Sequence, residues 1–370
     1  MRTPRKASHA LNAVCPYFTM FPLEFPLRAL RGADRSTARA FDPFCGRGTT
    51  NYAARCRGIA SYGLDASPVA VAIANAKIAV TTQKQVLDLL EEILAAEFDV
   101  ELPVGSFWTA AFHRSTLRQL CRLRTGLQGR RSDAAAVLRA VVIGCLHGPR
   151  SKRITHAGYF SNQMPRTFAS KPDYSVRFWA AHELKPPKLD VRGPIKRKLE
   201  RIFLSNPAVE FEKGWIRVGD SLQASSYDGV PEGLTHVITS PPYYGLVTYV
   251  EDQWLRNWFL GGSSTIEYGQ RTRLSHRSPD DFARSLAIVW NHCGDKLASE
   301  GKMVVRFGSI GSRDREPRAI FRQSLEYSTH DWRICRTLAV GTAWRGKRQA
   351  DAMGTQSKPT QEYEFTVRPA

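Results

Sequence analysis

The sequence TSPPYYG at residues 239–245 combines a hydroxyl, two prolines and two aromatic rings, and it directly follows the short apolar run at residues 236–239. β-Branched residues favour strands, whereas Pro241 and Pro242 remove two N–H donors and disfavour helix at Ser240. The pattern therefore predicts a stiff, extended corner at the carboxyl end of a buried strand. In open α/β sheets, ligands bind at this edge.

Such a corner suits an exocyclic amine on a planar ring. The Ser240 hydroxyl and the Pro241 carbonyl can accept the two hydrogens of an NH2 group, whose nitrogen is a poor nucleophile because its lone pair is delocalised into the ring. Tyr243 can stack on that ring, an interaction worth roughly 1–3 kcal/mol for a nucleobase. The alternative is a surface turn, since Ser-Pro-Pro is also common in loops.

A second stretch, DPFCGRGTT at residues 42–50, stands between an apolar run and a helical pattern that continues through Arg57. Gly46 and Gly48 allow a ligand to approach the backbone closely, and the start of the helix offers unpaired N–H groups. Asp42 suits an ammonium group rather than a phosphate. No lysine follows in the P-loop position, so a nucleoside triphosphate site is not expected.

Two further carboxylates end predicted strands. Asp65 follows the alternating residues 59–64, and it lies 17 residues beyond Gly48, close to the spacing of about 20 at which an acid binds a ribose diol in this architecture. Its alternative role is to cap the helix that opens at residues 67–68. Asp220 ends the next strand pattern and can accept a hydrogen bond from an adenine amino group.

Positive charge is concentrated in one part of the chain. The 370 residues have a formal net charge of +19, and residues 113–201 contain 20 Lys and Arg against 5 Asp and Glu. A local excess of this size indicates a polyanionic partner, most simply nucleic acid phosphates. The alternative is a basic face that only keeps the protein in solution.

Within this basic region, residues 149–174 mix cations, amides and aromatic rings, a mixture that can bind phosphates, stack on bases and read base edges. The residues predicted to contact DNA here are Arg150, Lys152, Arg153, Asn162 and Arg166. The alternative is a long packed loop that covers the catalytic domain.

The cysteines and the hydropathy limit which metal sites, cellular compartments and membrane spans the sequence allows. The seven cysteines are scattered without a C-x-x-C pair or zinc-like spacing, which favours free thiols in a reducing cytoplasm and predicts no metal site. No apolar run approaches 18 residues, and the basic start of the chain lacks the apolar core of a signal peptide, so neither a membrane span nor secretion is expected.

Taken together, these stretches resemble the DNA amino-methyltransferases, which transfer a methyl group from S-adenosylmethionine to N4 of cytosine or N6 of adenine. DPFCGRGTT is similar to the cofactor motif of that family, and TSPPY is similar to its catalytic motif. Residues 17–22 resemble the preceding N-terminal cofactor motif more weakly. The resemblance implies an α/β fold: a Rossmann-like seven-stranded methyltransferase sheet with a largely helical basic insertion.

The resemblance also implies domain limits and residue roles. Residues 1–80 and 214–370 would form the catalytic domain, and residues 81–213 an insertion that binds DNA or recognises the target. The cofactor would contact Tyr17, Thr19, Asp42, Phe44, Gly46, Gly48, Thr49, Thr50, Asp65 and Asp220. Catalysis on a base extruded from double-stranded DNA would use Ser240, Pro241, Pro242 and Tyr243. Flipping costs a few kcal/mol, which stacking and pocket contacts offset.

Several substrates remain open. In the resembled family a serine before Pro-Pro-Tyr favours cytosine N4, but adenine N6 is kept as an alternative, as is an RNA base. A nucleic-acid-binding module without catalysis is the third reading. The basic insertion falls between Asp65 and Asp220, which is not where the family places its recognition region, so the insertion either reads sequence or only clamps the duplex.

The patterns also predict the elements that position these residues. Helices are expected at residues 23–30, 67–80, 83–98, 107–127, 133–147, 195–204 and 251–260, the last packing on the sheet through Trp254 and Trp258. Further strands are expected at residues 301–307, 331–340 and 363–367.

Overall fold

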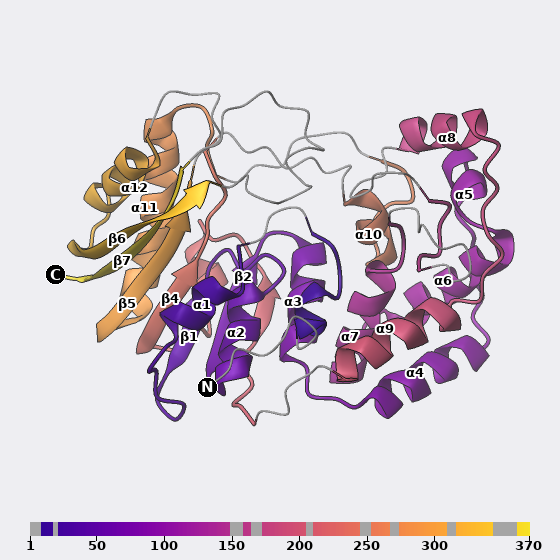
Figure 1. Cartoon of the computed structure of the whole chain (residues 1–370), viewed down its shortest axis with the longest axis horizontal. Helices are drawn as coiled ribbons and strands as arrows, with labels where there is room; N and C mark the ends of the chain where they lie inside the picture. The colour runs from indigo at the N-terminus through magenta and orange to yellow at the C-terminus, as the bar shows by residue number, and fades with distance from the viewer. Residues whose placement is uncertain are drawn as a thin grey trace. The chain divides into compact units, whose positions relative to one another are not determined.

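The structure is a computed structural model of the chain, and the chain divides into two compact units (Figure 1). We call residues 19–74, 209–248 and 271–370 the sheet unit, and residues 1–18, 75–208 and 249–270 the helical unit. Within these units the structure describes residues 9–17, 21–148, 158–163, 172–204, 210–244, 253–266, 274–308, 316–342 and 361–370.

The sheet unit contains a seven-stranded mixed sheet with the order β3-β2-β1-β4-β5-β7-β6. The strands β3, β2, β1, β4 and β5 pair in parallel, and β7 runs antiparallel to both β5 and β6. The strand bounds are β1 Arg39–Asp42, β2 Ala60–Asp65, β3 Ile216–Val218, β4 Leu234–Thr239, β5 Leu297–Phe307, β6 Trp332–Thr342 and β7 Gln361–Pro369. The predicted α/β class with a Rossmann-like seven-stranded sheet is confirmed.

The helices of the sheet unit begin where sequence signals place them. Helix α2 follows the glycine loop, and α11 begins after Ser278, whose hydroxyl accepts a hydrogen bond from Asp281 N with Pro279 at the first helical position. The bounds are α1 Glu24–Ala29, α2 Thr49–Arg57, α11 Pro279–Lys296 and α12 Pro317–Glu326, and a short 3-10 helix, η3, spans Ala224–Tyr227. Helix α3, Pro68–Ile78, begins in the sheet unit and ends in the helical unit.

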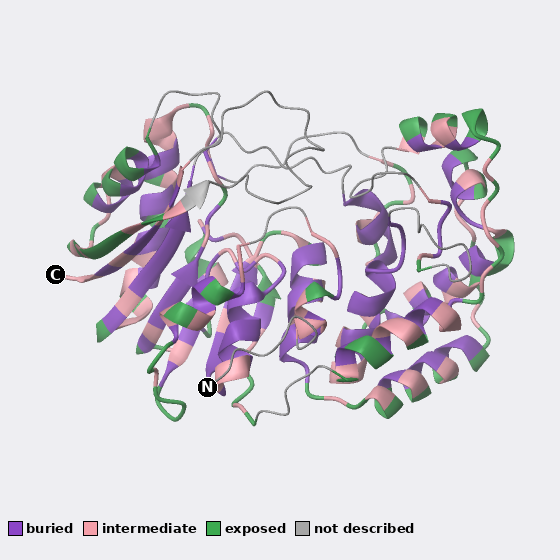
Figure 2. Ribbon diagram, viewed as in Figure 1, coloured by how far each residue is buried: buried purple, intermediate pink, exposed green. Residues whose placement is uncertain are grey.

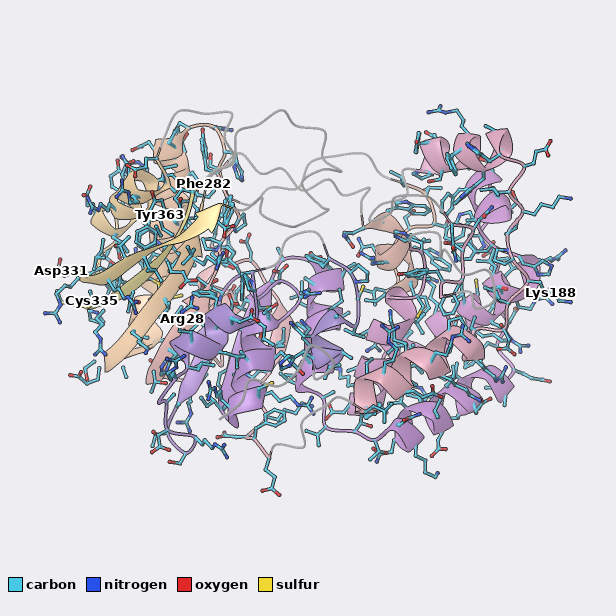
Figure 3. The ribbon with its side chains drawn as sticks, viewed as in Figure 1. Arg28, Lys188, Phe282, Asp331, Cys335 and Tyr363 are labelled. Carbon is cyan, nitrogen blue, oxygen red and sulfur yellow. The ribbon has the colours of Figure 1, made fainter. Side chains whose placement is uncertain are left out.

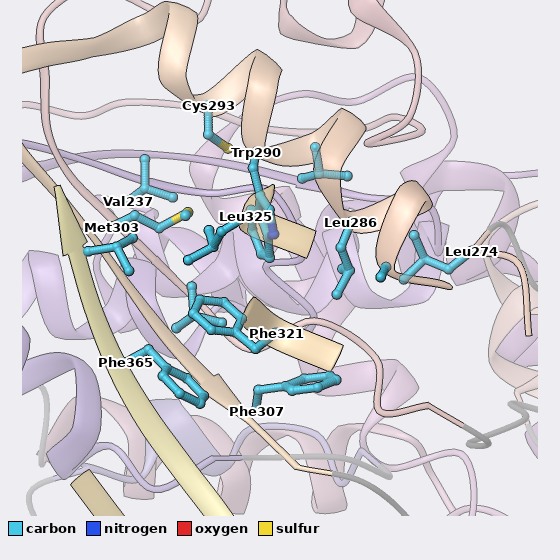
Figure 4. Packing of buried hydrophobic residues seen from close by; sticks show 14 of the residues in the cluster. Val237, Leu274, Leu286, Trp290, Cys293, Met303, Phe307, Phe321, Leu325 and Phe365 are labelled. Carbon is cyan, nitrogen blue, oxygen red and sulfur yellow. The ribbon is translucent and has the colours of Figure 1, made fainter. Parts of the chain in front are cut away.

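One face of the sheet carries the main hydrophobic core. Alternate side chains of each strand point to this face. Phe41 of β1, Val237 of β4 and Met303 of β5 are among them, and they are buried in one cluster with residues of α11 and α12. The central strands are accordingly buried along most of their length (Figure 2). Phe282 of α11 belongs to this cluster (Figure 3), and Phe321 of α12 stacks on Phe365 of β7 with ring centroids 4.1 Å apart (Figure 4). This packing fixes β7 beside β5.

The helical unit is built mainly from the predicted insertion. Its helices are α4 Gln83–Ala95, α5 Ser106–Ala111, α6 Arg114–Leu127, α7 Asp133–Ile143, α8 Pro172–Ala181, α9 Arg192–Leu204 and α10 Trp254–Phe259, preceded by the 3-10 helix η2 Leu11–Ala13. The single helix predicted over residues 107–127 is two, because His113 leaves the helical conformation and its ring accepts a hydrogen bond from Ser115 N, which caps α6.

Helix α10 does not support the prediction that Trp254 and Trp258 pack on the sheet. Both rings are buried in the helical unit against Trp108 of α5, with centroid separations of 5.5 Å and 4.5 Å. The tryptophans are core residues, as predicted, but they complete an aromatic core of the helical unit. Residues 249–270 therefore join this unit although they follow the Ser-Pro-Pro corner in sequence. Among the described helices, none combines the length and apolarity needed to cross a membrane.

Candidate active site

The two motifs meet at one edge of the sheet. Strand β1 ends at Asp42, the neighbouring parallel strand β4 ends at Thr239, and the Thr239 hydroxyl donates a 2.6 Å hydrogen bond to Asp42 Oδ1. Thr50, in the first turn of α2, donates from its hydroxyl to the Ile238 carbonyl at 3.1 Å. The glycine loop and the Ser240 corner thus begin from bonded neighbours at the carboxyl ends of adjacent strands, the edge where open α/β sheets bind ligands.

Backbone hydrogen bonds hold the glycine loop against the next strand. Cys45 N donates to the Leu64 carbonyl at 2.8 Å, and Gly46 N donates to Asp65 Oδ2 at 2.8 Å. The buried Ser221 hydroxyl, which follows β3, also donates to the Pro43 carbonyl at 2.5 Å. Ser221 was not among the predicted site residues, although its place directly after the strand-end acid Asp220 could have indicated it. The loop is therefore held by residues at the ends of β2 and β3, which lie on the same side of β1.

Asp42 is fully buried, and its two carboxylate oxygens differ. Oδ1 accepts bonds from Thr239 and from Phe44 N at 3.1 Å, whereas Oδ2 is buried with no hydrogen-bond partner. Burial raises the pKa of Asp42 to about 7, and the nearby Asp65 adds to that rise. An oxygen of this kind is ready to accept a bond from a donor that enters the loop.

The two glycines of the loop have different surroundings. Gly46 has a φ of +51° and opens to free space, because an added Cβ would meet only the Phe44 carbonyl oxygen at 4.0 Å. Gly48 has a φ of +72°, and an added Cβ would lie 2.7 Å from the Cβ of Ala74 on α3. Gly46 thus fits the predicted close approach of a ligand, whereas Gly48 allows close packing of α2 and α3.

The other predicted cofactor residues of the sheet unit lie around this loop. Asp65 Oδ1 accepts from Ser67 N at 2.8 Å in the turn before α3, while its Oδ2 supports the loop. The residue that caps α3 is Ser67, whose hydroxyl accepts from Ala70 N at 3.3 Å, so the alternative role of Asp65 as the helix cap is not supported. Asp220 is half-buried and accepts from Leu222 N at 3.1 Å. Phe44 packs against the sheet core, and the first residues of α2, Thr49 and Thr50, are buried.

The Ser-Pro-Pro corner leaves β4 with Ser240 half-buried, Pro241 buried and Pro242 exposed. Tyr243 then turns back onto the sheet unit. Its ring meets Phe307 edge-on with centroids 5.9 Å apart, and its hydroxyl donates to Glu362 Oε1 at 2.8 Å. The ring predicted to stack on a base is therefore anchored at its hydroxyl end.

Behind Tyr243 lies a group of buried charges that sequence reasoning missed. Arg306 of β5 donates from Nε to Glu362 Oε2 at 3.0 Å and from Nη1 to Glu364 Oε1 at 3.1 Å, and its Nη2 also bonds Glu362. Arg28 of α1, labelled in Figure 3, binds the second oxygen of Glu364. An arginine within the apolar run of β5 was the available signal, since buried charges require partners.

Some predicted residues lie elsewhere. Tyr17 belongs to the helical unit and is half-buried. Thr19, Arg150, Lys152, Arg153 and Arg166 fall outside the described residues. Asn162 is buried in the helical unit, where its side-chain amide donates to the carbonyls of Ala110 and Leu184 at 3.3 Å and 2.9 Å. Both amide hydrogens are thus used in packing, which does not support base reading by Asn162.

Part of the basic excess of the helical unit is also internal. Arg139 donates to the carbonyls of Leu127 and Arg130 at the end of α6, and Lys198 donates to the Gly144 carbonyl at the end of α7. Cations at helix carboxyl ends complement the helix dipole. Exposed cations remain on this unit at Arg114, Arg118, Arg131, Arg177, Lys185, Lys188, Lys196 and Arg201. In the part of the chain that is described, no group of three or more His, Cys, Asp or Glu side chains could hold a metal ion.

Comparisons with known proteins give only distant similarities. No protein-family model matches the chain, and no curated protein matches it. Among solved structures, the rRNA methyltransferase AviRa from Streptomyces viridochromogenes matches with 14% identity over 99% of this chain and 94% of that one, at a TM-score of 0.36.

A geranyl diphosphate methyltransferase in complex with SAM matches with 8% identity over 94% of this chain and 84% of that one, at a TM-score of 0.35. Precorrin 8w decarboxylase of Methanobacterium thermoautotrophicum matches with 9% identity over 97% of this chain and 95% of that one, at a TM-score of 0.34. Similarities at these TM-scores do not decide activity or substrate.

Proposed function

We propose that this protein is an S-adenosylmethionine-dependent methyltransferase that acts on the exocyclic amine of a base extruded from duplex DNA, most simply cytosine N4. The observation that carries the proposal is the Thr239–Asp42 hydrogen bond, because it brings the predicted cofactor loop and the predicted amine-binding corner to adjacent strand ends. Adenine N6 is the alternative target at the same corner.

The residues present fit the cofactor. Asp42 Oδ2 is a buried acceptor without a partner, which suits the ammonium of the methionine end, and the open space at Gly46 suits close contact with the backbone. Asp65 would take the ribose and Asp220 the adenine. S-adenosylmethionine supplies a methyl group on a positively charged sulfur, which reacts by direct displacement without a metal or a covalent enzyme intermediate.

On the acceptor side, the Ser240 hydroxyl and the Pro241 carbonyl would bind the two amine hydrogens and orient the nitrogen lone pair toward the methyl group. The helical unit would supply phosphate contacts. Its exposed lysines and arginines, of which Lys188 is labelled in Figure 3, support a polyanionic partner even though some of its arginines are used internally.

The direct test is to incubate the protein with methyl-labelled S-adenosylmethionine and either duplex DNA or total RNA, digest the nucleic acid and identify the labelled nucleoside. We expect 4-methylcytosine from DNA, and Ser240→Ala serves as the matched variant that removes only the acceptor hydroxyl. Label found only in RNA would refute the DNA substrate. If neither nucleic acid is labelled and calorimetry detects no binding of S-adenosylmethionine, the remaining hypothesis is a nucleic-acid-binding module without catalysis.

A further inference from the structure

Ser221 directly joins the two loops that would bind opposite ends of the cofactor. Its hydroxyl donates to the Pro43 carbonyl at 2.5 Å, and Ser221 follows Asp220 in sequence just as Pro43 follows Asp42. All four residues belong to the sheet unit. Strands β1 and β3 are not neighbours, because β2 lies between them in the sheet. The hydrogen bond therefore connects the ends of two strands that do not pair with each other.

The Pro43 carbonyl depends on this donor. Pro43 is buried, and because a proline has no N–H, the carbonyl is its one backbone group that can form a hydrogen bond. Ser221 is also buried, with an exposed fraction of 5%. Removal of the hydroxyl would leave a buried acceptor unsatisfied, which costs more than the loss of an exposed hydrogen bond.

A second hydrogen bond holds the main chain of Ser221. The Tyr227 hydroxyl donates to the Ser221 carbonyl at 3.0 Å. The Tyr227 ring is buried in the core, where it meets Phe41 of β1 edge-on with centroids 5.7 Å apart and lies 4.8 Å from the ring of His292 on α11. Core packing thus fixes the position of Ser221, so its hydroxyl cannot move away from Pro43 without disturbing that packing.

Each of the two loops also has hydrogen bonds of its own. At Asp220, Oδ1 accepts from Leu222 N at 3.1 Å and the carbonyl accepts from Gln223 N at 2.9 Å, which together close a tight turn. The glycine loop has its two N–H bonds to residues of β2. Loss of the Ser221 hydroxyl should therefore leave both turns formed and change their position relative to each other.

We infer that Ser221 is a positioning residue that acts through Pro43 to set the distance between the carboxylates of Asp42 and Asp220. This inference rests on the proposed function and deepens it. In that function Asp42 holds the ammonium of S-adenosylmethionine and Asp220 holds its adenine, so one molecule must reach both. Two contacts made by one ligand strengthen each other only when their spacing matches the ligand. Ser221 thus favours the whole cofactor over a fragment that carries only the adenosine part.

Calorimetric titration of Ser221→Ala with two ligands tests this role. S-adenosylmethionine, which spans both loops, should bind roughly tenfold more weakly than to the wild type, whereas the affinity for adenosine, which lacks the methionine part, should change less than about twofold. Ser225→Ala is the matched control, because it makes the same change at an exposed serine of η3 and should leave both affinities within about twofold. An equal loss for both ligands, or no loss for either, would overturn the inference.

A double-mutant cycle with Asp42→Asn measures the coupling between the two loops. Alone, Asp42→Asn should weaken the binding of S-adenosylmethionine and leave that of adenosine unchanged. In the Ser221→Ala background, where the two contacts are no longer matched in spacing, Asp42→Asn should cost roughly threefold less affinity than in the wild type. A merely structural Ser221 predicts the same cost in both backgrounds, and that result would contradict the inference.

Tyr227→Phe tests the same role if Ser221→Ala does not fold, because it keeps the ring in the core and removes the hydroxyl that holds the Ser221 carbonyl. It should weaken S-adenosylmethionine roughly threefold to tenfold and adenosine less than about twofold. If the wild type binds S-adenosylmethionine and methylates DNA but these variants weaken both ligands equally, the inference alone fails. If the wild type binds neither ligand, the proposed function fails, and the inference fails with it.

Discussion

Thr239 donates its hydroxyl hydrogen to Asp42 across 2.6 Å, and both residues are fully buried. The bond joins two motifs that lie 197 positions apart in the chain. It also bears on the carboxylate itself, because the Thr239 hydroxyl lowers the pKa of Asp42 and so opposes the larger effect of burial, which raises it to about 7. The first prediction follows from that balance.

The affinity for S-adenosylmethionine should rise with pH through the pKa of Asp42. An ammonium group favours the ionised carboxylate, so below about pH 7 binding must first displace a proton, and the affinity should fall up to tenfold per pH unit. Isothermal titration calorimetry in buffers of different ionisation enthalpy measures this proton release. Thr239→Val should move the midpoint to higher pH, and Asp42→Asn should abolish the dependence; a pH-independent wild type would contradict the assigned role.

The same carboxylate should make the free protein less stable as pH rises. Its folded pKa of about 7 lies above the ordinary value of 3.8, so its contribution is fully present below about pH 4 and is lost as pH rises through 7. Denaturant unfolding of the wild type and of Asp42→Asn at pH 5 and pH 8 measures the effect. The stability difference between the two proteins should change between these pH values, and a constant difference would argue against a buried Asp42.

Ser240→Ala should lower turnover while leaving cofactor affinity nearly unchanged. The hydroxyl contacts the target amine in the proposed complex, and loss of one such contact in a buried site costs roughly 1–3 kcal/mol, or about tenfold to a hundredfold in kcat. Steady-state kinetics together with calorimetry separate the two effects. A large loss of S-adenosylmethionine binding would assign Ser240 to the cofactor side instead.

Gly48→Ala should destabilise the protein more than Gly46→Ala. Both positions have positive φ, which costs roughly 1–2 kcal/mol for an added Cβ, but only the Gly48 methyl would overlap Ala74, which adds about 1–3 kcal/mol of overpacking. Thermal and denaturant unfolding compare the two variants. Gly46→Ala should instead weaken S-adenosylmethionine binding, so the two variants distinguish a glycine needed for helix packing from a glycine needed for ligand contact. Equal losses of stability in the two variants would refute these separate roles.

Neutralising Arg150, Lys152 and Arg153 together should weaken DNA binding and flatten its salt dependence. Each lost phosphate contact lowers the slope of log K against log salt by about 0.9. Titrations at several salt concentrations measure the slope. Neutralising the exposed Arg333 and Arg336 of β6 controls for net charge, and an unchanged slope in the triple variant would make these three cations structural.

The strands and loops of the site could be predicted because their signals are local. The β-branched run before Ser240 and the glycines after Asp42 each specify a strand end, and parallel pairing then brings such ends to one edge. Helix α11 could also have been found, since Ser278, Pro279 and the two following acids form a helix start. It was missed although the signal was present.

Other features could not be read from local pattern. The Glu362–Tyr243 bond depends on the antiparallel pairing of β7 with β5, which places Glu364 opposite Arg306. Helix α10 looked amphipathic, but its partner, Trp108, is set by tertiary packing in the helical unit. Charge counting overstated the positive charge that is free at the surface for a similar reason, because Arg139 binds helix-end carbonyls.

Strand β7 carries a constraint that reaches beyond stability. Its side chains alternate, so Glu362 and Glu364 face Arg306 while Tyr363 and Phe365 face the apolar core. If the register of β7 against β5 shifted by one residue, these two sets would exchange faces. Both carboxylates would then be buried in the apolar core, and the guanidinium would face aromatic rings instead of its acidic partners. The alignment of β7 with β5 is thus a condition for seating Arg306, and a slipped form would also lose the Glu362 bond that anchors Tyr243, two residues beyond the first proline of the corner.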